Sequence, residues 1–191
     1  MNFLGHLYFS NNNVDLMYAN LFGDFVKGKD LERFSDVQKK GIILHRAIDQ
    51  YIDHHPAVIK LMNQLYPFLP KVTGIAIDLF FDHLLAKQWE NYHTAPLPYF
   101  LSKFYDTSIQ DDPNYTVEYK AFILKLKSYN WIALYPEFSA LEKMSHGVSS
   151  RISFKNALEK APEIFLQFES EIEKTFTLFM KDAQNYLPKY F

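Results

Sequence analysis

The chain has 191 residues, of which 48% are hydrophobic and 17% aromatic, which suits a globular domain with a substantial core. The net charge is −2 and the pI is near 6.4, so overall charge gives no indication of nucleic-acid binding. The absence of cysteine excludes disulfides, thiolate metal ligands and a cysteine nucleophile.

The N-terminal segment argues against export. Residues Met1–Leu7 lack a basic region, and the polar run Asn11–Asn13 follows too soon for a signal peptide. No apolar run approaches the ~20 residues of a membrane span. We therefore expect a cytoplasmic protein that binds neither membranes nor nucleic acid.

The hydrophobic pattern predicts an all-α fold. Apolar residues recur three and four positions apart, and sustained alternation is rare, so we expect a single-domain helical bundle over residues 1–191. In chain order, the expected helices are Asp15–Phe22, a second capped by Ser35 or Asp36 and ending before Pro56, then Pro56–Leu65, Val72–Tyr92, Val117–Tyr129 and a long last helix.

Two details of these helices matter for the site and the core. Gly23 is expected to end the first helix, leaving Asp24 at an irregular junction that faces a cleft. The last helix carries an apolar stripe that is expected in the core, formed by Phe165, Phe168, Ile172, Phe176 and Phe179.

Acids and a histidine recur at helical spacing in the second helix. His45, Asp49 and Asp53 are each four residues apart, so their side chains share one face. Imidazole and carboxylate ligands without sulfur favour Mn²⁺, Fe²⁺ or Mg²⁺, and Zn²⁺ also remains open. Such a metal ion promotes hydrolysis of phosphate esters.

A second acidic pair interrupts an apolar helix. Asp78 and Asp82, followed by His83, lie in a segment that otherwise belongs in a core. Burying an unpaired carboxylate is costly, so these acids need a cation, hydrogen-bond donors or water at a cleft. We expect the two acidic helix faces to enclose a metal ion.

Five blocks of the first half of the chain resemble the acyl carrier protein phosphodiesterase family, the hydrolases that remove 4′-phosphopantetheine from holo acyl carrier protein. The blocks are Met1–Leu7, Asn20–Gly28, Gly41–Asp49, Asp53–Pro56 and Asp78–Trp89. The family is similar to HD-type metal-dependent phosphohydrolases, so the resemblance implies an HD-like helical fold and favours Mn²⁺. It also implies that Asp24 is an essential acid of the metal site.

These observations lead to one mechanistic hypothesis, in which water attacks the serine-linked phosphodiester and releases 4′-phosphopantetheine. The expected metal ligands are Asp24, His45, Asp49, Asp78 and Asp82. We expect His83 or His6 to give the leaving serine its proton, and Arg46 and Lys27 to hold phosphate oxygens. The basic stretch Lys27–Lys40 is expected to face the acidic surface of the carrier protein.

Two other functions remain open at this point. One is a metal-dependent phosphohydrolase that acts on a nucleotide or another small phosphate ester, although the chain has no GxxxxGK[ST] or GxGxxG loop. The other is a non-catalytic helical binding protein in which the acids only pair with Lys and Arg. A test of metal binding distinguishes these functions, because the phosphodiesterase and the small-ester phosphohydrolase both need a metal ion and the binding protein does not.

Overall fold

A computed structural model describes residues 1–191, which form α-helices and short 3₁₀ segments with no strand. Helix accounts for 71% of the chain, so the predicted all-α class is confirmed. None of the helices combines the length and hydrophobicity needed to cross a bilayer. The α-helices are α1 (Phe3–Tyr8), α2 (Val14–Leu21), α3 (Asp36–His54), α4 (Pro56–Leu65), α5 (Thr73–Lys87), α6 (Leu97–Asp106), α7 (Val117–Ser128), α8 (Phe138–Ser149), α9 (Ala161–Gln167) and α10 (Glu169–Tyr186).

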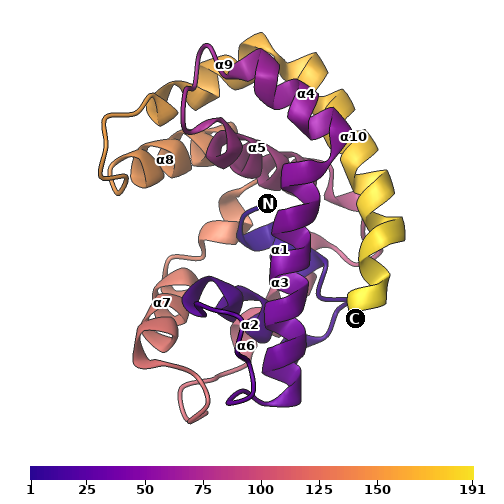
Figure 1. Ribbon diagram of the computed structural model, residues 1–191, viewed down its shortest axis with the longest axis vertical. Coiled ribbons are helices and arrows are strands. Elements are labelled where there is room, and N and C mark those ends of the chain that lie inside the picture. The colour runs from indigo at the N-terminus through magenta and orange to yellow at the C-terminus, as the bar shows by residue number, and fades with distance from the viewer.

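Helix α3 runs through the middle of the molecule, with α10 along the outer edge (Figure 1). Ser35 caps α3 through a capping box in which its side chain accepts from the Gln38 N–H and Gln38 bonds back to the Ser35 N–H. The helix ends at His54, and Pro56 occupies the first turn of α4, where its missing N–H costs nothing. The expected cap and both boundaries around Pro56 are confirmed.

Helix α1 was not expected from the sequence, and a side chain from a distant helix caps it. Asn2 makes no side-chain cap; instead the carboxylate of Asp82 in α5 accepts from the backbone N–H groups of Asn2, Leu4 and Gly5 at 3.2, 2.8 and 3.1 Å. These are N–H groups that a helix N-terminus leaves without an internal partner. Asp82 therefore fixes α1 on α5.

Three expected element boundaries were wrong. Gly23 does not end the first helix, because the chain continues from α2 into the 3₁₀ segment η1 (Phe22–Phe25). The predicted helix Val72–Tyr92 is shorter, since α5 ends at Lys87 and a separate turn, η2 (Trp89–Asn91), follows. The long last helix is two helices, α9 and α10, which meet at Phe168, where φ is −116° and ψ is 20°.

The apolar stripe of this last segment nevertheless packs as expected. Four of its five residues are buried, and Phe168 is partly buried against the core. The rings of Phe176 and Phe179 lie 5.4 Å from that of Phe81 in α5. The stripe therefore holds α10 against α5.

Helices α2 and α3 approach so closely at Gly41 that a side chain does not fit. A Cβ there would lie 2.3 Å from Ala19 Cβ and 2.4 Å from the Ala19 carbonyl carbon. We expect Gly41→Ala to lower the free energy of unfolding by about 1–3 kcal/mol, because backbone has to move. Urea unfolding measures this change.

Gly147 provides the matched control for this substitution. It also lies inside a helix, α8, but a Cβ there meets no atom within 4 Å. Gly147→Ala should leave the protein as stable or stabilise it by roughly 0.5–1 kcal/mol, since alanine favours a helix over glycine. Equal losses in the two variants would contradict the packing explanation.

Candidate metal centre

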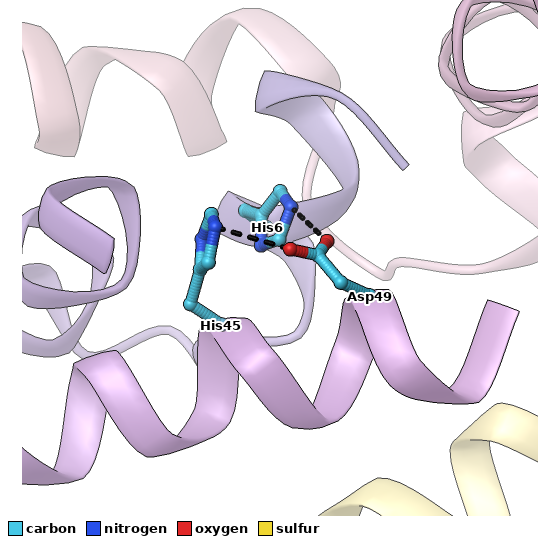
Figure 2. A group of neighbouring side chains, drawn as sticks. All are labelled: His6, His45 and Asp49. Carbon is cyan, nitrogen blue, oxygen red and sulfur yellow. Dashed lines mark ion pairs between the residues drawn. The ribbon is translucent and has the colours of Figure 1, made fainter. Parts of the chain in front are cut away.

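Two histidines and one aspartate converge where α1 meets α3. One ligand atom from each of His6, His45 and Asp49 lies within 4.8 Å of the others. Figure 2 shows each imidazole paired with a different oxygen of Asp49: His6 Nε2 lies 3.4 Å from Oδ1, and His45 Nε2 lies 3.2 Å from Oδ2. The expected i,i+4 alignment of His45 and Asp49 is present.

Asp24 in η1 completes this group from a third segment. Its Oδ1 lies 3.2 Å from His45 Nε2, so this nitrogen faces two carboxylates. The backbone beside Asp24 comes very close to the ring, because a Cβ on Gly23 would lie 2.4 Å from His45 Cγ. Gly23 is therefore needed for close approach to His45 rather than for ending a helix.

The charges of the group indicate that it is suited to a cation. Burial lowers the pKa of His45, but the hydrogen bonds that His45 donates to Asp24 and Asp49 outweigh burial and raise it to about 9. Burial raises the pKa of Asp49, but the two histidines outweigh it and hold that pKa well below its usual value. Burial lowers the pKa of His6, so the proton that a metal ion would displace from this group is the one that His45 Nε2 holds between the two carboxylates.

The donor set also matches what a divalent metal ion requires. Three carboxylate oxygens and two imidazole Nε2 atoms meet with no sulfur ligand, and His45 Nδ1 is buried without a hydrogen-bond partner. The two rings stack, with centroids 4.2 Å apart and planes 18° apart. His6, His45 and Asp49, with Asp24 beside them, therefore form a possible site for a divalent metal ion.

A buried amide sets the tautomer of His6. Asn20 Nδ2 donates to the His6 carbonyl at 2.9 Å and to Ser10 Oγ at 3.1 Å, which turns Asn20 Oδ1 toward the ring. His6 Nδ1 lies 2.9 Å from that oxygen and must carry the proton. The lone pair of a neutral His6 is therefore on Nε2, which faces Asp49, as a metal ligand requires.

The group opens into a cavity of about 370 Å³. The acids lining it are Asp24, Asp49, Asp53 and Asp78. Asp78 bonds to the N-terminal ammonium group, whose nitrogen lies 2.8 Å from its Oδ1, whereas Asp53 forms no ion pair or hydrogen bond. The cavity volume lies within the ~300–1,000 Å³ range of small-ligand sites.

Two residues expected at this site lie elsewhere. Asp82 is completely buried and does not line the cavity, and its oxygens are occupied by the N–H groups of α1. Burial raises the pKa of Asp82 to about 7, although the nearby N-terminal charge and the backbone N–H donors both lower it. His83 Nδ1 donates to the Tyr135 carbonyl at 2.7 Å, and its ring lies 5.3 Å from that of Phe165.

The two expected phosphate-binding cations also lie outside the cavity. Arg46 Nη2 donates to the carbonyls of Gly28 at 2.7 Å and Val26 at 3.2 Å, so it holds the loop that follows η1. Lys27 is exposed on that loop and forms no ion pair. Neither side chain lines the cavity.

Comparison with known proteins identifies the family. A family model described as acyl carrier protein phosphodiesterase matches residues 1–183. The chain belongs to the acyl carrier protein phosphodiesterase family. The chain is similar to proteins of that name from Photorhabdus laumondii, 28% identical over 97% of this chain and 96% of that protein, and Yersinia pestis, 26% identical over 97% and 98%. No solved structure matches the chain, so an HD-like arrangement stays a prediction.

Within this acyl carrier protein phosphodiesterase fold, sequence reasoning missed the surroundings of His6. His6 was expected to donate a proton, but the structure places it beside His45 and Asp49. Asn20, which orients the ring, was noted only as part of a family block. His6 and Asn20 both lie in blocks that carry the family resemblance, but no local spacing in the sequence connects them.

If the group binds a divalent metal ion, we expect Asn20→Ala to weaken that binding by roughly 10–100-fold, the usual effect of removing a partner that orients a ligand. The His6 N–H would lose its acceptor, and the ring would be free to turn. Ser10→Ala is the control, because it removes a neighbour of the amide but leaves the Asn20–His6 contact. Calorimetric titration with Mn²⁺ checks both, and equal affinities would contradict a positioning role for Asn20.

Proposed function

We propose that this protein hydrolyses holo acyl carrier protein to apo carrier protein and 4′-phosphopantetheine. Membership of the family gives the reaction class, and the His6–His45–Asp49 group is the observation that carries the proposal to a particular site. Hydrolysis adds the hydroxyl group of water to the phosphorus, the bond to the carrier's serine oxygen breaks, and the remaining proton of that water ends on the serine oxygen. The reaction needs a cation near the phosphoryl oxygens and water beside them.

The protein's own side chains divide this task. His6, His45, Asp49 and Asp24 would hold a divalent metal ion, for which we propose Mn²⁺. A bound metal ion supplies charge neutralisation at phosphoryl oxygens and makes water more acidic. Asn20 keeps the proton of His6 on Nδ1, and Gly23 allows Asp24 to reach the ring of His45. Asp82 keeps α1, and with it His6, in place.

The basic stretch that follows Asp24 is the proposed contact for the carrier protein. Lys27, Lys29, Arg33 and Lys40 are exposed, whereas Lys39 pairs with Glu32 at 3.4 Å. We expect added salt to slow association with the acidic carrier and to change dissociation less, since exposed charges steer encounter and salt screens them. Stopped-flow association at low and high salt measures this, and equal association rates would remove the steering role.

The decisive experiment measures the mass of the carrier protein. The protein is incubated with Mn²⁺ and holo carrier, and in parallel with Mn²⁺ and a panel of nucleotides. We expect the carrier to lose its phosphopantetheine while the nucleotides stay intact. Nucleotide hydrolysis without carrier cleavage would favour a small-ester phosphohydrolase, and failure to bind any divalent metal would favour a non-catalytic binding protein.

A further inference from the structure

A second, apolar cavity adjoins the proposed metal centre. It has a volume of about 320 Å³ and shares Asn2, Phe3 and Val148 with the first cavity. Its other walls come from α8 and from η3 (Trp131–Leu134). We propose that this cavity binds the pantetheine arm of the substrate, an inference that rests on the proposed function because the arm is joined to the phosphorus that is attacked.

The lining suits the chemistry of that arm, which carries a gem-dimethyl group, two amides and a terminal thiol. Apolar contact comes from Phe3, Trp131, Leu134, Met144 and Val148. The exposed cations Lys143 and Arg151 lie at the same cavity and form no ion pair within the protein, so their N–H groups are free for amide carbonyls. A mostly apolar wall with a few polar donors is typical of small-molecule sites.

The position of the basic stretch favours the arm over the carrier protein itself as occupant. Lys27–Lys40 follows η1, which carries Asp24, and none of its residues lines the apolar cavity. The phosphodiester links the carrier to the arm, so the two parts of the substrate must leave the phosphorus in different directions. The carrier protein then contacts the basic stretch Lys27–Lys40, and the arm contacts the walls of the apolar cavity.

Gly147 allows a selective test, because it lines the cavity and has open space where a side chain would begin. Gly147→Phe places a ring at the cavity without displacing a neighbour of the new Cβ. Ser139→Phe is the matched control, since it adds the same ring to α8 at an exposed position that does not line the cavity. Only Gly147→Phe should weaken binding of the pantetheine arm.

The probe is pantetheine, which has the arm but no phosphate, and the signal is tryptophan fluorescence. Trp131 lines the cavity, and the other tryptophan, Trp89, is buried away from it. Pantetheine should change the emission of the parent protein and of Ser139→Phe but not of Trp131→Phe. We expect Gly147→Phe to weaken this binding, and to raise KM for holo carrier, by about tenfold or more, the usual range for a steric change in a pocket.

Each result decides between the possible occupants. Equal pantetheine binding in Gly147→Phe and Ser139→Phe would overturn the proposal. Weaker capture of apo carrier by Gly147→Phe would also overturn it, because the cavity would then contact the carrier protein. Failure of the parent to cleave holo carrier would overturn the proposed function alone, since pantetheine binding is measured without cleavage.

Discussion

Replacing Asp49 by asparagine is expected to lower cleavage of holo carrier by roughly 10³- to 10⁴-fold, the scale seen when a principal catalytic group is removed. Asp49 is the one acid that contacts both imidazoles, with a different oxygen to each. An amide keeps its shape but presents an N–H₂ group to one of the two rings and removes a negative charge. Mn²⁺ affinity should fall together with activity.

Asp53 is the matched control for this substitution. It is also an aspartate of α3, one turn further along, and it lines the same cavity without pairing to a histidine. Asp53→Asn should keep Mn²⁺ affinity and most of the activity. Calorimetric titration with Mn²⁺ and the carrier mass assay give both quantities, and circular dichroism checks the fold. Full activity in Asp49→Asn, or equal losses in the two variants, would remove the His6–His45–Asp49 group as the site.

Helix α3 shows how much of the site could be predicted from local sequence. The Ser35 cap, Pro56 at the next helix start and the four-residue spacing of His45 and Asp49 are all local features. Helical geometry alone is enough to place those two side chains together. The part of the metal centre that lies on α3 was therefore predictable, whereas the part contributed by other elements was not.

Helix α1 shows why the rest was not predictable. It has six residues, too few to form a stable helix alone, and its cap comes from Asp82, about 80 residues further along the chain. His6 therefore had no visible structural context in the sequence. The same contact explains why the sequence led to the prediction of Asp82 as a metal ligand. A buried acid requires either a cation or hydrogen-bond donors, and the sequence does not show backbone donors.

The second large effect is expected at Asp82, and it is an effect on stability. Asp82→Ala should lower the free energy of unfolding of the metal-free protein by about 3–5 kcal/mol, because it leaves three backbone N–H groups at the start of α1 without an acceptor. That is a large share of the ~5–15 kcal/mol by which proteins are usually stable. Urea unfolding in the presence of EDTA measures the change.

Asp82→Asn separates a role in holding α1 from a role as a metal ligand, even if the alanine variant fails to fold. The amide keeps one oxygen as an acceptor but turns an N–H₂ group toward a backbone donor, so we expect a smaller loss of about 1–3 kcal/mol. Asp53→Asn, at an acid without hydrogen bonds, should cost little. If Asp82 were a metal ligand instead, Asp82→Asn would lower Mn²⁺ affinity as much as Asp49→Asn does and leave the metal-free protein as stable as before. The buried position of Asp82 and its three backbone donors favour the structural result, in which α1 and its histidine depend on an acid that lies outside the His6–His45–Asp49 group.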